Sequence, residues 1–301
     1  MSGEGAAPAC RVGAIVVNHD AGQALLACVE SLRRAGVREV VVVDNASTDG
    51  SLAELAEADG ETVLLPTGRN LGYGTAVNRG VERAAAEYLL VCNPDVVVDE
   101  ALPRALLAVL DAHQDVAICG PRIDSTDGTR YPSARAFPTF GVAVGHAFVG
   151  LIRPDNRWSR RYRLEGGAQD EHDVDWVSGA CLLVRRSAFE AVGGFDESYF
   201  MYVEDLDLCW RLRRAGWRVR YVPGASAVHL QGVSSARRPY RMLIAHHAST
   251  WRFARRSAEG AERLLLPLVG AGLLARLAVA LGRQLSVTRR APRNRSHAAV
   301  D

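Results

Sequence analysis

The sequence contains no lysine, so all 36 of its basic residues are arginines. We infer no function from this bias in composition. Cysteine is sparse: the six cysteines form no C-x-x-C pair, and the N-terminus lacks the charged start, apolar middle and small-residue cleavage site of a signal peptide. Together these absences favour a reducing, cytoplasmic setting in which the thiols are free and several of them fill the core.

Acidic residues are scarce in the C-terminal part of the chain. From Arg237 to the end, 13 arginines stand against three acidic residues, which gives this part a charge of +10. Because the whole chain carries +2, residues 1–236 carry about −8. An acidic body with a basic tail indicates that the two parts meet different partners.

No internal repeat is visible, and the N-terminal part alternates short apolar strands with helices. Strands are expected at 11–20, 39–50, 61–66, 88–99 and 116–120, and helices at 23–36, 51–58 and 73–87 and from the end of the 88–99 strand to about 112. This alternation predicts an α/β fold with a mostly parallel central sheet flanked by helices. Hairpins and loops are expected over 121–172, a strand and helix at 173–189, a helix at 203–216 and two short strands at 217–230.

A glycine pair, Gly72-x-Gly74, forms part of the pattern by which dinucleotide-binding proteins hold a pyrophosphate. That pattern belongs at the first strand-to-helix turn, with an acidic residue about 20 positions later. Here the pair follows the third predicted strand, and no acid ends a strand at that distance, since position 92 is a cysteine. An NAD-linked enzyme is therefore disfavoured. We expect the glycines to let the backbone pass close to something at a helix start.

Polar residues appear where three predicted strands end, at Asn18, at Asp44-Asn45 and at Asn93-Pro94-Asp95. Open parallel sheets bind their ligands beyond the carboxyl ends of the strands. A carboxylate at Asp44 can accept the N3–H of a uracil or thymine ring. It can equally cap the turn that follows, and both interpretations stay open.

Asp95 and His229 are candidate metal ligands. Oxygen ligands on a strand-end turn suit Mg²⁺ or Mn²⁺, which use one or two carboxylates together with phosphate oxygens. His229 closes a predicted strand and could supply a nitrogen ligand or a phosphate contact. A plain turn carboxylate and a structural histidine are the alternatives.

The densest group of acids lies in "FDESYFMYVEDLDL" (195–208), framed by aromatic and aliphatic residues. Glu204 and Asp205 fall in the first turn of a predicted helix, where the helix dipole favours negative charge. Burial near apolar rings raises the pKa of a carboxyl, so the two influences oppose each other and leave a usable general base. Acids also collect at helix starts for structural reasons alone.

Seven segments in this order resemble the nucleotide-sugar glycosyltransferases of family two, which have the GT-A fold. They are VVNHDAGQALLACVESL, VVDNASTDGS, NLGYGTAVNRG, NPDVVVD, VSGACLLVRRSAFEAVGGFDESYF, EDLDLCWRLRRAGW and VHLQGVSS. The resemblance implies a GT-A catalytic domain over 11–235. We expect a flexible N-terminus at 1–10, a helical, basic and apolar region at 236–289 and a disordered tail at 290–301.

The resemblance also implies a role for each matching position. The nucleotide-sugar donor would lie near Asn18, Asp44, Asn70, Gly72, Gly74, Asn78 and Arg79. A divalent cation (Mg²⁺ or Mn²⁺) would bind Asp95 and His229, and the acceptor pocket would be shaped by Trp176, Ser178 and Gly179. Asp205 would be the catalytic base, with Glu204 its neighbour in the acceptor site. Asn93-Pro94-Asp95 keeps only one carboxylate of the family's Asp-x-Asp motif, so we expect weak, donor-dependent metal affinity.

Three segments, LLPTGRNLGYGTAVNRG, YPSAR and FDESYFMYVEDLDL, are similar to rhamnosyltransferases within that family. This likeness implies transfer of L-rhamnose from dTDP-β-L-rhamnose to polyprenyl-diphospho-N-acetylglucosamine in cell-wall linker synthesis. A single displacement without an enzyme nucleophile would invert the anomeric configuration and give an α-linked product. The alternatives are another nucleotide sugar and acceptor, or a nucleotide-sugar-binding protein without turnover.

Residues 263–284 are almost wholly apolar, but only 12 residues lie between Arg263 and Arg276. A membrane span needs about 20, and an arginine at mid-membrane costs roughly 2.5–3.5 kcal/mol. We therefore expect an element that lies on anionic lipid at the inner face of the plasma membrane, which suits a polyprenyl-linked acceptor. Packing on the catalytic domain is the alternative. Nucleic acid is not expected, because the arginines are interleaved with aliphatic rather than aromatic residues.

Overall fold

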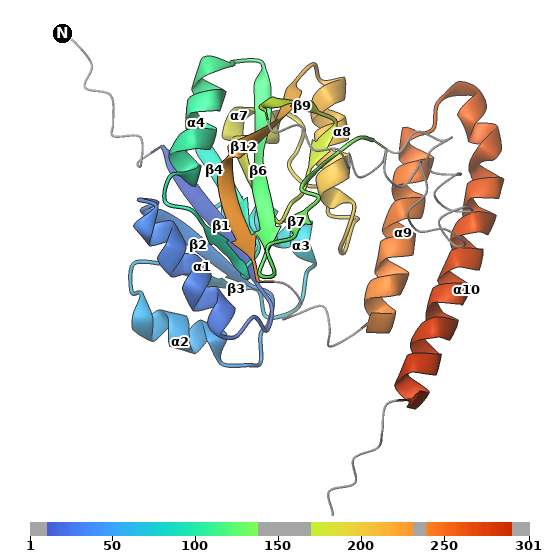
Figure 1. Ribbon diagram of the computed structural model, residues 1–301, viewed down its shortest axis with the longest axis horizontal. Coiled ribbons are helices and arrows are strands. Elements are labelled where there is room, and N and C mark those ends of the chain that lie inside the picture. Colours follow the sequence, from blue (N-terminus) through green and yellow to red (C-terminus); the bar gives the residue numbers. More distant parts are fainter. Residues whose placement is uncertain (1–10, 138–169, 231–238, 291–301) are drawn as a thin grey trace, which may run out of the picture.

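The computed structural model describes residues 11–137, 170–230 and 239–290. The predictions of a flexible N-terminus and of a tail beyond Arg290 lie outside the described residues, as does much of the predicted loop region before 172. Within the described parts, strands and helices alternate and build one large sheet with helices on both faces (Figure 1).

The first half of the sheet is parallel, as the alternating pattern predicts. Four strands stand in the order β3 (Val63–Pro66), β2 (Glu39–Asp44), β1 (Val12–Asn18) and β4 (Tyr88–Cys92). The helices that connect them are α1 (Gln23–Arg34), α2 (Ser51–Ala58) and α3 (Tyr73–Val81). Runs of valine, isoleucine and leucine in β1, β2 and β4 leave every residue of β1 and β4 buried, as expected for strands covered on both faces.

The second half of the sheet is mixed. Strand β11 (Cys181–Arg185) runs antiparallel to β4 on one side and to β6 (Val116–Ser125) on the other. Strand β12 (Arg218–His229) is parallel to β6, and β5 (Val96–Val98) closes the edge antiparallel to β12. Two shorter strands extend this half: β7 (Arg130–Tyr131) pairs with β6, and β9 (His172–Val174) pairs with β12. Strands β8 (Ala134–Arg135) and β10 (Trp176–Val177) pair with each other in a separate two-stranded antiparallel sheet. The prediction of a mostly parallel sheet therefore describes the first half better than the second.

Several element boundaries differ from the sequence prediction. The single strand expected within 173–189 is three strands, followed by α7 (Arg186–Ala191). The two strands expected at 217–230 are one, β12, whose register shifts between Val222 and Ser226. Pro223 lies in that interval, and a proline cannot donate to the ladder, so the strand bulges there and then continues.

Helix α3 was expected to reach residue 87 but ends at Val81. The guanidinium of Arg186 explains the early end, because it donates to the carbonyls of Val81, Ala84 and Ala86. A carboxylate from Glu39 accepts the N–H groups of residues 85 and 86 from the other side. Long-range side chains thus satisfy backbone groups that a longer helix would have satisfied internally.

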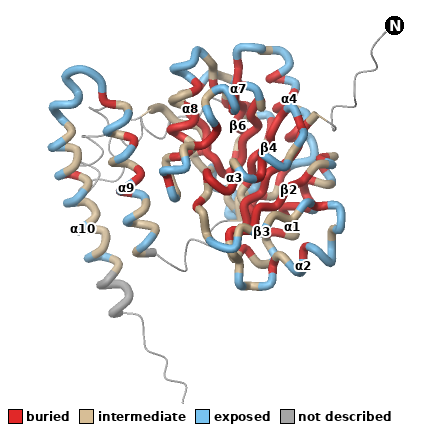
Figure 2. The backbone as a smooth tube through the Cα atoms, turned by 180° about the vertical axis from the view of Figure 1, so that it is seen from behind, coloured by how far each residue is buried: buried red, intermediate tan, exposed pale blue. Residues whose placement is uncertain are grey.

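The core forms two layers, one on each face of the sheet, and the buried chain follows the strands in Figure 2. Side chains alternate along β1, so that Val16 faces one layer and Val17 the other. The first layer packs under α1 and α4 (Leu102–Ala112), and the second under α3, α7 and α8 (Glu204–Arg214).

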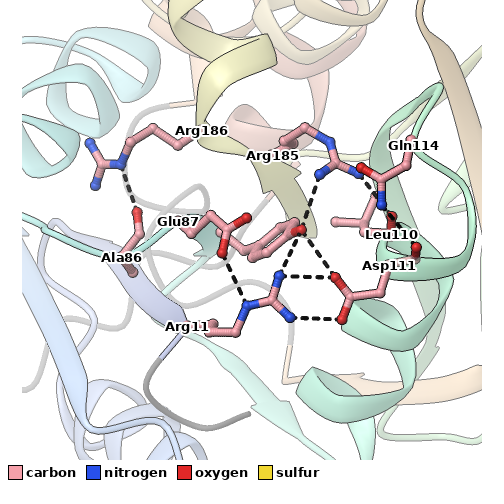
Figure 3. Close-up of polar contacts among 9 residues, drawn as sticks. Arg11, Ala86, Glu87, Leu110, Asp111, Gln114, Arg185 and Arg186 are labelled. Carbon is pink, nitrogen blue, oxygen red and sulfur yellow. Dashed lines mark hydrogen bonds and ion pairs between the residues drawn. The ribbon is translucent and has the colours of Figure 1, made fainter. Parts of the chain in front are cut away.

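A polar network closes the edge of the sheet where β1 and β4 begin and β11 ends (Figure 3). Both terminal nitrogens of Arg11 donate to Asp111, at 2.8 and 3.0 Å. The hydroxyl of Tyr88 accepts from Arg11 and from the buried Arg185, at 3.1 and 3.0 Å. The hydrogen-bonded guanidinium of Arg11 holds the pKa of Asp111 below its ordinary value. These polar groups therefore pair with one another at the end of the sheet opposite Asn18 and Asp44.

Two long helices, α9 (Pro239–Ser257) and α10 (Leu266–Arg290), stand beside the sheet, joined by a 3₁₀ turn over Gly260–Leu265 (Figures 1 and 2). Phe253 of α9 is buried against Trp210 of α8, with the ring centroids 6.0 Å apart. Helix α10 runs on to Arg290, which the sequence assigned to the tail. Pro267 does not interrupt it, because it lies in the first turn, where its missing N–H would have no intrahelical partner.

The glycine pair at the start of α3 does permit a close approach, as predicted. Gly72 has φ +87°, and a Cβ there would lie 2.2 Å from the carbonyl oxygen of Phe200. That same oxygen accepts the N–H of Tyr73 at 3.0 Å. A Cβ on Gly74 would lie 2.9 Å from the Cβ of Phe195. What passes so close is the chain's own segment 195–203, which leads into α8.

We predict that Gly72→Ala destabilises the protein far more than Gly68→Ala. Both glycines have positive φ, but a Cβ on Gly68 would meet nothing within 4 Å. Gly68→Ala should therefore cost about 1 kcal/mol of backbone strain, and Gly72→Ala about 2–4 kcal/mol, because a backbone carbonyl must also move. Denaturant unfolding of the two variants measures the difference, and equal losses would contradict the close packing of Gly72 on Phe200.

Candidate active site

The candidate site residues gather at one edge of the sheet. Asn18 pairs with Asp44 in the β1–β2 register, and β4 ends beside them at Cys92. Because β11 is antiparallel to β4, its first residue, Cys181, lies opposite Cys92. The strand ends and the turn that precedes β11 therefore share this edge. Asp205 joins it from α8, where its Oδ2 accepts the N–H of Gly179 at 2.8 Å.

Asp44 is buried, and its carboxylate closes the turn after β2. Its Oδ2 accepts the N–H of Ser47 at 3.1 Å, and its Oδ1 accepts the side-chain amide of Asn18 at 2.9 Å. The turn-capping contacts are thus present. They use one lone pair of Oδ2, so a contact from this oxygen to a nucleotide base stays a prediction.

Asn45 was not singled out as a functional residue, yet it fixes the segment that follows. Its side-chain amide donates to the carbonyl of Gly72 at 3.0 Å, and its Oδ1 accepts the N–H of Leu71 at 3.2 Å. Asn70 tightens the same turn by accepting the N–H of Gly72 at 3.0 Å. The end of β2 and the start of α3 are therefore held together at the site edge.

The rest of the 70–79 segment faces the protein or the surface. The side chain of Asn78 donates to the carbonyl of Phe195 at 2.9 Å and accepts its N–H at 3.0 Å, which ties α3 to segment 195–203. Arg79 is half exposed and pairs with Glu82 at 3.1 Å. Contacts of Asn70, Gly72, Gly74, Asn78 and Arg79 with a donor stay predictions.

Asp95 and His229 lie together although 134 positions separate them in sequence. His229 Nε2 is 3.0 Å from Asp95 Oδ1, and both side chains are about nine-tenths buried. Strand β5 follows Asp95 directly, and its pairing with β12 sets Val96 beside His229. The other ring nitrogen of His229, Nδ1, is buried and has no partner among the described residues. The Tyr131 ring meets the imidazole edge-on at 5.6 Å.

These two side chains fit a cation site that needs further oxygen ligands. Two ligand atoms at neighbouring octahedral positions, each about 2.1 Å from a magnesium ion, lie about 3 Å apart. Asp95 Oδ1 and His229 Nε2 are 3.0 Å apart and hydrogen-bonded to each other, so a cation bound by both would replace that hydrogen bond. No group of three or more metal-ligating side chains occurs in the described parts of the chain. A cation held here would have to share its coordination with a bound diphosphate.

Glu204 and Asp205 form the first turn of α8, and burial decides their protonation. Burial, helped by the charge of Asp205, raises the pKa of Glu204 to about 8. Its Oε2 is buried without a partner among the described residues. Burial also raises the pKa of Asp205, although the N–H groups of Gly179 and Leu206, each 2.8 Å from a carboxylate oxygen, oppose the rise. Burial thus outweighs the stabilisation that a helix start gives to negative charge.

Tyr73 and Arg135 complete the surroundings of the acid pair, and sequence reasoning assigned neither a role. The Tyr73 hydroxyl donates to the carbonyl of Gly179 at 2.6 Å, while the N–H of Gly179 donates to Asp205. The charge of Arg135 acts to lower the pKa of Asp205. The only sequence signal was their position, Tyr73 within the 70–79 segment and Arg135 at the end of YPSAR.

Of the three predicted acceptor residues, Gly179 is the one that touches the acid pair. A Cβ on Gly179 would lie 3.3 Å from the Cβ of Asp205. Trp176 is buried, with its indole N–H donating to the carbonyl of Ala136 at 3.1 Å. Ser178 is also buried, and its backbone N–H donates to Ser133 at 2.8 Å. Trp176 and Ser178 therefore shape the turn from inside, and a direct acceptor contact stays a prediction.

Two families match the chain, one over each part. A family described as glycosyl transferase family 2 matches residues 14–193, and one described as glycosyl transferase family group 2 matches residues 170–288. Among curated proteins, the N-acetylglucosaminyl-diphospho-decaprenol L-rhamnosyltransferase of Mycobacterium tuberculosis is 42% identical over 252 residues, covering 79% of this chain and 82% of the relative. The rhamnosyltransferase WbbL of Escherichia coli is 33% identical and covers 48% of this chain and 52% of the relative.

Solved structures share the fold at much lower identity. The mannosyltransferase PcManGT from Pyrobaculum calidifontis, in complex with GDP-Man and Mn²⁺, has a TM-score of 0.55 at 18% identity and covers 93% of this chain and 79% of its own. TarS of Staphylococcus aureus in complex with UDP has a TM-score of 0.55 at 15% identity, covering 93% and 73%. The GT-A fold expected from the resemblance is thereby confirmed. The chain belongs to glycosyl transferase family 2.

Proposed function

We propose that this glycosyltransferase moves L-rhamnose from dTDP-β-L-rhamnose to a polyprenyl-diphospho-N-acetylglucosamine, with inversion at the anomeric carbon. The relative that is 42% identical carries an activity of this kind in its name. The observation that carries the proposal is the position of Asp205, a carboxylate with a raised pKa at the same sheet edge as Asp44 and Asp95.

The proposed reaction combines one proton transfer with one displacement at the anomeric carbon. Asp205 takes the proton of an acceptor hydroxyl as that oxygen attacks the anomeric carbon from the face opposite the nucleotide. The bond to the diphosphate oxygen breaks in the same step, so the configuration inverts and a β-linked donor gives an α-linked product. Gly179 supports this role, because its N–H holds one oxygen of Asp205 in a fixed direction.

Asp44 is proposed to accept the N3–H of the nucleotide base through Oδ2, which keeps a free lone pair. Thymine and uracil present the same N3–H, so this contact does not distinguish dTDP from UDP. The choice of dTDP-rhamnose therefore rests on the similarity to the mycobacterial rhamnosyltransferase.

A divalent cation would be held by Asp95 and His229 together with oxygens of the donor diphosphate. When bound, it offsets the negative charge that gathers on the departing diphosphate. The burial of both side chains and the 3.0 Å between Asp95 Oδ1 and His229 Nε2 support this assignment. Mg²⁺ and Mn²⁺ both accept a carboxylate together with phosphate oxygens.

Helix α10 is proposed to lie on the anionic membrane that holds the acceptor, at the cytoplasmic face. The helical stretch Gly260–Gln284 is long and apolar enough to cross a bilayer, and its most apolar window has a mean hydropathy of 2.2 and is 6% buried. Leu264 and Leu274 are 81% and 69% exposed, so these side chains lack cover from the protein. Arginines on both sides of the stretch, and Arg276 within it, favour a position among lipid headgroups.

We predict that Asp205→Asn lowers kcat on the order of 10²-fold or more, since a positioned base contributes about 10²–10⁴-fold. The measurement is transfer of radiolabelled rhamnose from dTDP-rhamnose to the lipid-linked acceptor. Asp115→Asn is the matched control, because Asp115 lies in an exposed ion pair with Arg218 at the far edge of the sheet. Near-normal turnover in Asp205→Asn would remove Asp205 from the role of base.

We predict that kcat falls as the pH is lowered, with a midpoint above the ordinary pKa of an aspartate. Burial raises the pKa of Asp205, and the base works only when unprotonated, so activity is present above the raised pKa and lost below it. Glu204 and Asp205 titrate as a pair, so the midpoint belongs to both. A pH profile of kcat at saturating donor measures it, and constant kcat down to pH 4 would contradict a buried base.

We predict that the full chain sediments with vesicles containing anionic lipid and is released by alkaline carbonate. Leu264→Gln with Leu274→Gln should weaken the vesicle affinity about tenfold or more, because two exposed apolar side chains are lost. Val63→Thr, at an exposed valine of β3, is the control. Retention after carbonate treatment would show that α10 crosses the bilayer, and absence of binding would contradict membrane association.

A further inference from the structure

Segment 195–203 links three parts of the molecule. Its C-terminal end leads directly into Glu204 and Asp205. Its middle contacts the start of α3, through the carbonyl of Phe200 on Gly72 and Tyr73. Its outer side contacts α9. The direction in which the acid pair points therefore depends on how this segment is held from both sides.

The backbone just before the acid pair is strained. Tyr202 has φ +67° and Val203 has φ +71°, both in the left-handed region. Neither residue is a glycine, and a β-branched valine is rare there. Residues in such a conformation persist only where the surrounding structure holds them in place.

Helix α9 contributes the restraints nearest to this strain. The Ser249 hydroxyl, which is buried, donates to the carbonyl of Met201 at 2.9 Å. The imidazole of His246 meets the ring of Tyr202 edge-on, with the centroids 5.5 Å apart. These contacts fall on the two residues before Val203.

A second group of α9 contacts lies at the start of segment 195–203 and in the first turn of α8. Arg256 forms an ion pair with Asp196 at the start of the segment and lies 3.5 Å from Asp207 in the first turn of α8. Asp207 is fully buried, and it also accepts from Arg211 at 2.7 Å. Arg252 lies over the ring of Tyr199, 5.8 Å from its centroid.

We propose that α9 is a positioning element for catalysis, in which Ser249 and Arg256 hold segment 195–203 in the conformation that directs Glu204 and Asp205 at the acceptor. This inference rests on the proposed transfer reaction. It gives the C-terminal helices a task besides lipid contact: a chain whose α9 is displaced from the segment keeps its donor site but loses the direction of its base. Because α10 packs against α9, the helix proposed to lie on the membrane is connected to the acid pair through α9.

The test uses the full chain in detergent, with dTDP-β-L-rhamnose and an N-acetylglucosamine diphosphate on a short alkyl chain, so that lipid binding plays no part. Ser249→Ala should lower kcat roughly 3- to 10-fold, the range expected for one lost hydrogen bond, with the KM for donor unchanged. Ser257→Ala is the matched control, since the Ser257 hydroxyl donates only to Phe253 of its own helix. Arg256→Gln should behave like Ser249→Ala, and Arg255→Gln, at a neighbouring exposed arginine, like the wild type.

The pH profile separates positioning from simple destabilisation. A loosened segment admits water to the acid pair, so the pKa values fall toward their ordinary range and the acid limb of kcat moves to lower pH. Among the described residues, the other titratable or charged groups that interact with the pair are Tyr73 of α3, Arg135 of β8, Tyr202 and Cys209 of α8, and these variants alter none of them. A fall in kcat that only follows the folded fraction, or an unmoved acid limb in both variants, would overturn the proposal.

Turnover by the wild type decides the proposed function separately. If the wild type transfers no rhamnose, that function fails, and the positioning role is decided by ¹³C NMR titration of the carboxyl groups. A lower pKa for the acid pair in Ser249→Ala than in the wild type and in Ser257→Ala would support the role. Coincident titrations would overturn it.

Discussion

The hydrogen bond from the Gly179 N–H to Asp205 is the contact on which the site depends. It joins the turn before β11 to the first turn of α8, two elements that cover different parts of the sheet. Strand β11 begins opposite the end of β4 and runs back antiparallel to it, so the turn before β11 lies at the edge where the parallel strands end. The acid pair is thereby brought to the same edge as the polar ends of β1 and β2.

Burial determines the pKa values of Glu204 and Asp205. Segment 195–203 lies on the start of α3, and the absence of side chains at Gly72 and Gly74 lets it come within van der Waals contact. The acid pair at the end of the segment is buried, and this burial raises its pKa values although a helix start favours charge. The strained Tyr202 and Val203 show that this packing has an energetic cost.

The parts that the sequence predicted are those that local pattern determines. Valine-rich runs and helical spacing predicted β1, β2, β4 and the boundaries of α2. The acidic residues Glu204 and Asp205 indicated the start of α8. The five described cysteines are all buried and free, as expected of core residues. The boundaries that were predicted wrongly depend on distant residues. Arg186 donates to backbone carbonyls beyond the end of α3, and a bulge against β6 lets β12 continue past Pro223.

Within the site, the sequence predicted which residues take part better than it predicted which residues they contact. Asp95 and His229 were named together as candidate metal ligands, and they do lie together, because β5 pairs with the end of β12. The glycine pair was expected to permit a close approach of the backbone to another group. No local sequence pattern indicated that this group would be Phe200. Asn45, Tyr73 and Ser249 act through backbone carbonyls far away in sequence, and such contacts leave no periodic pattern.

We propose that Asp44, Asp95 and Asp205 surround one donor site at this edge of the sheet. A crystal structure of the full chain with a non-hydrolysable dTDP-rhamnose analogue and Mn²⁺ is the decisive test. We expect the thymine N3–H on Asp44, the diphosphate and cation beside Asp95 and His229, and the open side of the sugar facing Asp205. A nucleotide bound elsewhere, or a sugar with Asp205 on the side of its diphosphate, would contradict it.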